Sequence, residues 1–283
     1  MRLFACSDLH IDYPENFKWI NNLSISEFQQ DVIIIAGDVS NNIKIFKSAM
    51  ELIAKRFKKV MFVPGNHELW VKGTEYIDSL VKLHEIQRIL YDLGCNMSLY
   101  HSTELIVCPI FGWYDYSFAT VSEELREVWS DYYYCKWPLY IANTQDICSY
   151  FYGINPIQAP DIPNGKTVVT FSHFLPRIDL MPNYIPQKHK IKTPKTVSAV
   201  YKSHITEISE QYCWKLDPMR LIYPVLGSAR IDEIARRYHP QFHVYGHSHV
   251  NAECIIDGVH YINAALGYPS ETNISYRELR QII

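Results

Sequence analysis

Residues 60–68 read VMFVPGNHE, in which four apolar residues run into Pro-Gly and then into the polar side chains of Asn66, His67 and Glu68. A short apolar run that ends at Pro and Gly predicts a buried strand followed by a loop. The strand predicted at Val60–Val63 therefore places these polar side chains immediately beyond its carboxyl end.

Four other predicted strands end in the same way, with Asp or His close to small residues. They are Leu3–Cys6 before Asp8 and His10, Val32–Ala36 before Gly37-Asp38, Thr167–Phe171 before Ser172-His173, and Phe242–Tyr245 before Gly246-His247-Ser248-His249. In open α/β sheets, ligand sites form at the carboxyl ends of the strands. We therefore expect the polar residues after these strands to converge on one crevice.

The converging residues offer carboxylate, amide and imidazole ligands but no thiolate. This donor set suits manganese, iron or zinc, and it is compatible with magnesium. Seven ligands are too many for one ion but fit two, and the carboxylate of Asp38 could bridge ions about 3.5–4 Å apart. The sequence therefore predicts that this crevice binds a pair of divalent ions.

Elsewhere in the chain, short apolar runs alternate with longer amphipathic segments, which predicts an α/β fold. Further strands are expected at Glu104–Ile110, Ala252–Ile256 and Val259–Asn263, and Asp257-Gly258 between the last two indicates a hairpin. Helices are expected at Ile43–Phe57, Thr74–Asp92, Glu123–Ser130, Gln145–Tyr152 and Ile231–Tyr238.

Domain organisation follows from the absence of any linker that would divide the chain, so we predict a single domain over residues 1–283. Proline interrupts the stretch at about residues 175–224, at Pro176, Pro182, Pro186 and Pro194. Irregular segments of this length in a compact domain are usually functional or mobile. We expect a cap-like insertion there.

The overall charge is near zero, with 27 Lys and Arg against 30 Asp and Glu. This balance gives no general electrostatic reason to bind nucleic acid or anionic membranes. The seven cysteines include no CxxC pair, and a charged residue and a histidine within the first ten positions leave no room for a signal-peptide core. We expect a cytoplasmic protein with reduced thiols, no membrane association and no stable nucleic-acid complex, and we predict no particular oligomeric state.

Taken in order, the five strand ends contain the motifs D-x-H, G-D, G-N-H-E, a lone H and G-H-x-H. With these motifs, which extend from residue 8 to residue 249, the chain resembles the calcineurin-like metallophosphoesterase superfamily. Stretches such as Phe111-Gly112-Trp113-Tyr114 resemble a bacterial and plant-like branch of unassigned substrate. The resemblance implies two facing mixed β-sheets flanked by helices, a four-layer α/β/β/α sandwich.

The resemblance also implies how the ligands divide between the ions. One ion would be held by Asp8, His10, Asp38 and His249, and the other by Asp38, Asn66, His173 and His247. His67 would be the general acid beside the leaving group. The implied activity is metal-dependent hydrolysis of a phosphoric ester, by a phosphomonoesterase or phosphodiesterase with a dinuclear centre and a bridging hydroxide.

Two further residues are candidate substrate contacts. Arg177 follows His173 by four residues, and Trp70 lies shortly after the Asn66-His67 motif, so either could contact the substrate. The expected partner is a phosphate ester, with nucleotides among the candidates. The alternative is a catalytically silent binding scaffold with the same fold, which the retention of His67 and every ligand argues against.

Overall fold

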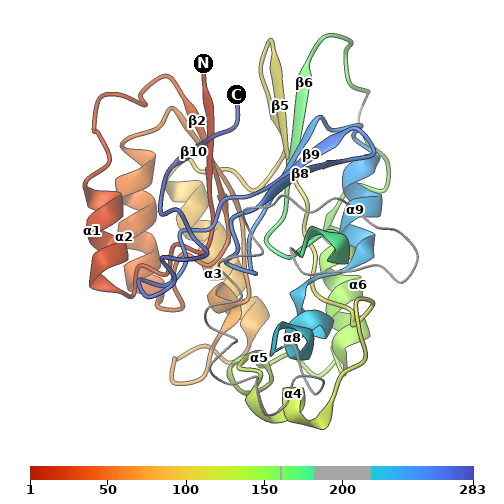
Figure 1. Ribbon diagram of the computed structural model, residues 1–283. Helices are drawn as coiled ribbons and strands as arrows, with labels where there is room; N and C mark the ends of the chain where they lie inside the picture. Colours follow the sequence, from red (N-terminus) through yellow and green to blue (C-terminus); the bar gives the residue numbers. More distant parts are fainter. Residues whose placement is uncertain (160, 182–217) are drawn as a thin grey trace.

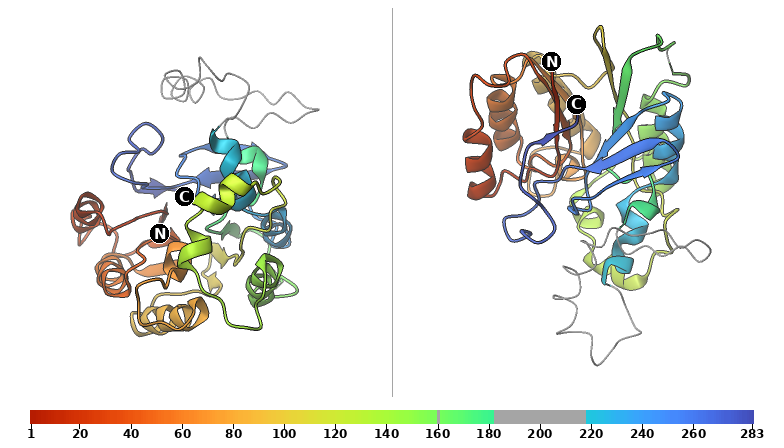
Figure 2. Two further views of the ribbon diagram at one scale, coloured as in Figure 1. Left: turned by 90° about the horizontal axis from the view of Figure 1, so that it is seen from below. Right: turned by 45° about the horizontal axis from the view of Figure 1, so that its top comes forward.

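The computed structural model describes residues 1–159, 161–181 and 218–283. Its strands form two sheets that face each other, and helices cover the outer side of each sheet (Figures 1 and 2). This arrangement confirms the predicted α/β/β/α sandwich of two mixed sheets.

The smaller sheet has the strand order β10-β1-β2-β3. Its members are β1 (Leu3–Cys6), β2 (Val32–Ala36), β3 (Lys59–Val63) and β10 (Arg280–Gln281). The first three strands are parallel, and β10 pairs antiparallel with β1. The parallel strands therefore bring their carboxyl ends to one edge.

The larger sheet has the order β4-β5-β6-β7-β9-β8. Its members are β4 (Tyr100–His101), β5 (Leu105–Pro109), β6 (Thr167–Phe171), β7 (Phe242–Tyr245), β8 (Glu253–Ile256) and β9 (Val259–Asn263). The central strands β5, β6, β7 and β9 are parallel, while β4 and β8 pair antiparallel at the edges. Asp257 and Gly258 adopt positive φ angles of 50° and 81° between β8 and β9, so the predicted hairpin is confirmed.

The helices are distributed over three places in Figure 1. Helices α1 (Pro14–Asn21), α2 (Ile43–Ala54) and α3 (Ser79–Asp92) lie beside the smaller sheet, and α6 (Thr144–Ile154) and α9 (Ala229–Arg236) beside the larger one. Helices α4 (Glu123–Val128), α5 (Asp131–Tyr134) and α8 (Pro218–Leu226) gather at the lower end of the molecule. Two 3-10 turns, η1 (His67–Leu69) and η2 (Ile178–Leu180), complete the described elements.

Side-chain caps begin several helices. The Asn42 side chain accepts from the backbone N–H groups of Lys44 and Ile45, and Asp78 does the same at the start of α3. The Ser228 side chain accepts from the Arg230 backbone at the start of α9. Such caps satisfy backbone donors that have no partner within the helix.

The core follows from the alternation of side chains along strand β1. Leu3 and Ala5 belong to a buried cluster shared with the larger sheet, whereas Phe4 and Cys6 belong to a second cluster shared with the helices. Successive side chains on a strand point to opposite faces, so a strand between two layers is apolar at most positions. This preference explains the mainly apolar runs that precede the polar loops.

His243 on β7 provides a pH-dependent term in the stability of the larger sheet. Its ring is fully buried between the Thr170 hydroxyl at 2.8 Å and the Ser172 hydroxyl at 3.0 Å. Burial disfavours the charged imidazole and lowers the pKa of His243 to about 4.

As the pH falls from about 6.5 to 4, His243 takes up a proton in the unfolded chain but not in the folded one. The free energy of unfolding therefore decreases over this range, by up to about 3 kcal/mol. We expect His243→Gln to have a shallower pH dependence of unfolding in this window. Urea unfolding of both proteins between pH 4.5 and 7 measures the difference in slope, and parallel curves would contradict the assignment.

The expected cap-like insertion at 175–224 falls largely on residues 182–217, which lie outside the described residues. Its first part contains η2, and its last seven residues belong to helix α8, so these ends are more regular than the proline spacing suggests. Leu175 is fully buried and bridges Gly227. The two ends of the segment therefore meet in the core, while the cap itself stays a prediction.

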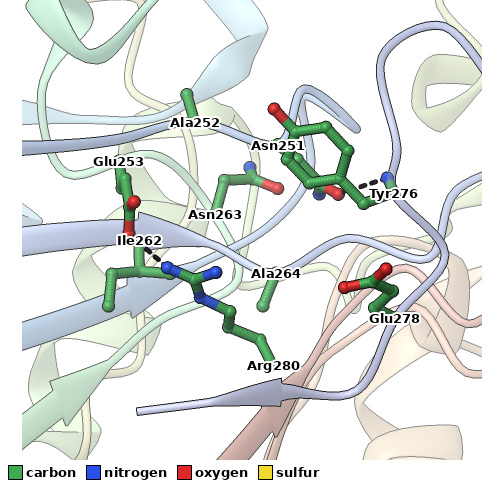
Figure 3. Close-up of a pocket in the computed structure, with 9 residues that line it drawn as sticks. All are labelled: Asn251, Ala252, Glu253, Ile262, Asn263, Ala264, Tyr276, Glu278 and Arg280. Carbon is green, nitrogen blue, oxygen red and sulfur yellow. Dashed lines mark hydrogen bonds and ion pairs between the residues drawn. The ribbon is translucent and has the colours of Figure 1, made fainter.

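A hollow of about 90 Å³ lies between β8, β9 and the C-terminal segment (Figure 3). Arg280 donates to Glu253 at 2.5 Å, and the Tyr276 backbone N–H donates to the Asn251 side chain at 2.7 Å. These contacts tie the C-terminal segment to the larger sheet. None of the predicted metal ligands lines this hollow.

The cysteines in the described part of the chain form no disulfide. Within the same residues, no helix combines the length and the apolar character needed to cross a bilayer.

Candidate metal centre

The loops after five strands meet at one end of the two sheets. Strands β1, β2 and β3 of the smaller sheet and strands β6 and β7 of the larger one each end beside this point. Among the described residues, three overlapping groups of side chains have ligand atoms within 4.8 Å of one another: Asp8, His10 and His249; His10, Asp38 and His67; and Asp38, His173 and His247. All the predicted carboxylate and imidazole ligands belong to these groups.

One half of the centre is formed by Asp8, His10 and His249. The Nε2 atoms of His10 and His249 lie 3.1 Å apart, and Nε2 of His249 lies 3.4 Å from Oδ1 of Asp8. Two nitrogens at this separation fit around one ion, since metal–nitrogen distances are about 2.0–2.1 Å.

The other half is formed around His173. Its Nε2 atom lies 3.1 Å from Nδ1 of His247, 3.1 Å from Oδ1 of Asn66 and 3.5 Å from Oδ2 of Asp38. Four potential ligand atoms therefore face a common point. Asn66 has the position that its motif predicts, with its oxygen directed at the imidazoles.

The backbone is unusual at the ligands themselves. Asp8, His10, Asp38, His247 and His249 all have φ between 39° and 67°. Residues other than glycine rarely adopt this left-handed conformation, which costs free energy and is concentrated at functional sites. The fold therefore holds five of the predicted ligands in strained conformations that turn their side chains toward one another.

Each of three ligand histidines is fixed through its second ring nitrogen. His173 Nδ1 lies 2.9 Å from the Ala36 carbonyl, and His247 Nε2 lies 3.0 Å from the Val225 carbonyl. His249 Nδ1 lies 2.7 Å from the Glu271 carboxylate. A hydrogen bond at one nitrogen fixes the tautomer and leaves the other nitrogen free to bind a metal.

Glu68 ties the loops of the smaller sheet together. Its fully buried carboxylate accepts from the backbone N–H groups of Asp38 at 2.8 Å, Val39 at 2.7 Å and Gly65 at 2.7 Å. The loop after β2 and the loop after β3 are thus fixed relative to each other. This contact positions Asp38 against Asn66.

The electrostatics of the centre favour a cation. Burial, followed by the charges of Glu68 and Asp8, raises the pKa of Asp38 well above its usual value. Burial opposes a charge on His249, yet the carboxylates of Asp8 and Glu271 raise its pKa to about 10. A divalent ion bound in place of these protons would compensate the charge of the buried carboxylates.

The donor set fits a divalent metal. Imidazole nitrogens and carboxylate and amide oxygens converge, and no cysteine belongs to any of the three groups. Such a set suits manganese, iron, zinc or magnesium rather than soft metals. Asp8, His10, Asp38, Asn66, His173, His247 and His249 are the residues that would hold it.

His67 belongs to one of the three groups, with His10 and Asp38, but it is more exposed than these two residues. Its Nε2 atom is 3.9 Å from Oδ2 of Asp38, and its side chain is 14% exposed, against 2% for Asp38. Trp70 stacks on the His67 ring with a centroid distance of 3.7 Å and an interplanar angle of 28°. The structure therefore places both predicted residues beside the ligands, with His67 accessible.

Arg177 lies in a different environment. Its guanidinium donates to Asp179 at 2.8 Å and to Asp232 at 3.3 Å, and it lies 3.5 Å from Asp257. These carboxylates hold the positive charge beside α9 and the β8–β9 turn. The predicted contact between Arg177 and the substrate has no support in this geometry and stays a prediction.

Comparison with protein families matches residues 1–251 to the calcineurin-like phosphoesterases. The chain belongs to this family. Its members hydrolyse phosphoric esters with bound metal, so this protein is a metal-dependent phosphoester hydrolase, as the motif order predicted.

One relative, PptH of Mycobacterium tuberculosis, matches this calcineurin-like phosphoesterase both in sequence and in structure. The chain is 25% identical to the [acyl-carrier-protein] phosphodiesterase PptH of Mycobacterium tuberculosis, over 99% of this chain and 83% of the relative. It also matches the crystal structure of phosphopantetheinyl hydrolase (PptH) from M. tuberculosis with a TM-score of 0.73 and 22% identity, over 100% of this chain and 95% of the other. The latter match supports the fold.

Three supporting residues of this phosphoesterase were not assigned a role from the sequence. Glu68 is part of the quoted motif, which signals its importance but not its function. Asp131 and Glu271 contact Asn66 and His249 across 65 and 22 residues, and no local pattern marks them. Only the folded chain brings these pairs together.

Gly65 leaves no room for a side chain in the phosphoesterase site. A Cβ atom there would lie 2.1 Å from Oδ1 of Asp38 and 2.7 Å from Cε1 of His173. We expect Gly65→Ala to weaken metal binding by at least roughly 10–100-fold, which is the effect of losing a group that supports a metal ligand. Titration of the metal-free protein with manganese, followed by calorimetry, measures this effect.

Gly153→Ala in α6 is the matched control, because a Cβ atom there meets nothing within 4 Å and φ is not positive. We expect this control to bind manganese like the unchanged protein. Equal affinities for all three proteins would show that the loop after β3 does not confine Asp38.

Proposed function

We propose that this protein is a dinuclear-metal phosphodiesterase that releases phosphopantetheine from a carrier protein. The observation that carries the proposal is the central position of Asp38 among the ligands. Its carboxylate belongs to one group with His10 and His67 and to another with His173 and His247. A single carboxylate between two ligand sets suits a bridge between two ions.

Two divalent ions bound there would supply a water of lowered pKa as the nucleophile and would neutralise charge on the phosphoryl oxygens. Manganese, iron and zinc are the proposed metals, with magnesium also compatible. The strained backbones of the proposed ligands and the carboxylate of Glu68 hold the receiving side chains in place. This preorganisation supports binding without rearrangement of the loops.

His67 is the proposed general acid. Burial, together with the positive charges of His249 and His173, lowers the pKa of His67 to about 3, so the ring is neutral before substrate binds. An anionic phosphodiester beside the ring favours its protonated form. The accessible imidazole can then give a proton to the departing alkoxide, a step worth about 10²–10⁴-fold in rate.

The proposed substrate class is taken from PptH, which is named an acyl-carrier-protein phosphodiesterase. This relative aligns with 99% of this chain. In a phosphopantetheinylated carrier protein, a phosphodiester links a serine oxygen to the pantetheine arm. A hollow of about 220 Å³ beside Asp131 has an aromatic and apolar lining that includes Trp113, Tyr132, Trp137 and Ile141. Such a lining suits the alkyl and amide groups of that arm.

The test uses the purified protein loaded with manganese and a phosphopantetheinylated acyl carrier protein. Intact-mass spectrometry should show conversion of the carrier to its unmodified form, with free phosphopantetheine released and with activity abolished by chelation. Bis-(4-nitrophenyl) phosphate, 4-nitrophenyl phosphate and a panel of nucleotides are assayed beside it. Turnover of phosphodiesters or nucleotides without attack on the carrier would replace the proposed substrate, and inactivity on every ester would remove the proposed function.

A further inference from the structure

Asp131, the first residue of α5, is a buried carboxylate without a basic partner among the described residues. It is 3% exposed, and its oxygens accept from Asn66 Nδ2 at 2.9 Å, Trp70 Nε1 at 2.6 Å and Trp129 Nε1 at 3.0 Å. Burial of a carboxylate costs free energy unless donors surround it. Here the donors include one amide and two indoles, the Tyr114 side chain is a further hydrogen-bond partner, and the amide and one indole touch the candidate site.

The first consequence concerns the metal ligand Asn66. Because its Nδ2 atom donates to Asp131, its Oδ1 atom faces His173 Nε2 at 3.1 Å. Rotation of the amide by 180° would direct the N–H₂ group at the metal ligands and would leave the Asp131 oxygen without this donor. Asp131 therefore selects the amide orientation in which Asn66 can bind a cation.

The second consequence concerns the proposed acid. The same Asp131 oxygen accepts from the indole N–H of Trp70, and the indole stacks on His67. Tyr134, on the same short helix as Asp131, lies on the Trp70 ring with a centroid distance of 4.9 Å and an angle of 31°. Helix α5 thus fixes the plane of the indole, and the indole fixes the plane of the imidazole.

We propose that Asp131 is a positioning residue that sets both the ligand oxygen of Asn66 and the ring orientation of His67. This inference rests on the proposed roles of these two residues. It means that the metal site and the acid are aligned by one carboxylate from the segment between the third and fourth motifs. Loss of this carboxylate should therefore affect metal affinity and proton transfer together.

The test compares Asp131→Asn with Trp70→Phe and with a control, Asp31→Asn. The Trp70→Phe variant keeps an aromatic ring but removes the indole donor, so it separates the acid from the metal ligand. Asp31 is also a buried carboxylate with three N–H contacts, all from Arg2, and it lies at the start of the chain's second strand, away from the ligands. Manganese affinity, thermal unfolding and turnover of phosphodiesters with nitrophenyl and alkyl leaving groups are measured for each.

For Asp131→Asn we expect about 10–100-fold weaker manganese binding. At saturating metal, we expect hydrolysis of the ester with the alkyl leaving group to be about 10²-fold slower, and hydrolysis of the nitrophenyl ester to be slowed much less. Trp70→Phe should show the same leaving-group dependence with unchanged metal affinity. Asp31→Asn should change only thermal unfolding. An unchanged metal affinity in Asp131→Asn, or equal rate losses on both leaving groups, would overturn the proposal.

These results are distinguishable from failure of the proposed function. If the unchanged protein hydrolyses neither phosphodiester, the function is wrong, and metal affinity alone then tests the Asn66 half of the proposal. If the unchanged protein is active and Asp131→Asn behaves like Asp31→Asn, only the positioning role is wrong.

Discussion

We expect Asp38→Asn to lose both metal ions and essentially all turnover. Asp38 stands between the two ligand sets, with Oδ2 3.5 Å from His173 Nε2 and Oδ1 accepting from the His67 backbone N–H at 3.0 Å. The amide is neutral and would present N–H groups where ligand oxygens are needed. Asn tolerates the φ of 55° at this position, so the backbone should fold as before.

Elemental analysis of the purified variant measures the metal content. The expected loss of rate is larger than the roughly 10–100-fold effect of removing a group that only supports a metal ligand. Asp12→Asn is the matched control, because Asp12 lies in the adjoining loop and accepts from the Ser40 hydroxyl at 2.7 Å without joining the ligand groups. Retention of two ions by Asp38→Asn would exclude Asp38 as the bridge.

Removing the His67 ring should separate proton transfer from metal binding. We expect His67→Ala to keep both ions, since its accessible side chain lies at the rim of the centre. Turnover of a phosphodiester with an alkyl leaving group should fall by about 10²–10⁴-fold, because the alkoxide then departs without a proton donor. A nitrophenolate needs no such proton, so hydrolysis of the nitrophenyl ester should change much less.

Steady-state rates on the two leaving groups, with metal content determined on the same preparations, measure this effect. The control is His84→Ala, which removes an exposed ring from helix α3. Equal alkyl-ester turnover by His67→Ala and the unchanged protein would show that another group donates the proton.

Much of the fold was predictable because each parallel strand has a strong local signal. The bounds predicted for Leu3–Cys6, Val32–Ala36, Thr167–Phe171 and Phe242–Tyr245 are those observed. These strands are buried on both faces, so their sequences are mainly apolar and end abruptly at the polar loops. The convergence of those loops followed from the shared direction of parallel strands.

The elements that the sequence analysis missed have weaker local signals. Helix α1 begins at Pro14 without a side-chain cap, and strands β4 and β10 have two residues each. The helix expected at Glu123–Ser130 ends at Val128, and α5 begins at Asp131 after a break. That break sets where the Asp131 carboxylate points, and its importance depends on Asn66 and Trp70, which are distant in sequence.

Arg177 shows that proximity in sequence does not determine where a long side chain points. It follows His173 closely, yet its backbone has left the strand end, and its guanidinium pairs with Asp179 and Asp232. The direction of a long side chain depends on charges from other elements, which a single sequence does not reveal. The ligands differ, because strand direction and strained φ angles determine where they point.

The most direct test of the account is the anomalous scattering of crystals soaked in a manganese salt, with data collected on both sides of the manganese absorption edge. We expect two peaks about 3.5–4 Å apart, one on each side of the Asp38 carboxylate. One peak should contact Asp8, His10 and His249, and the other Asn66, His173 and His247. A single peak, or none within reach of Asp38, would contradict the dinuclear centre.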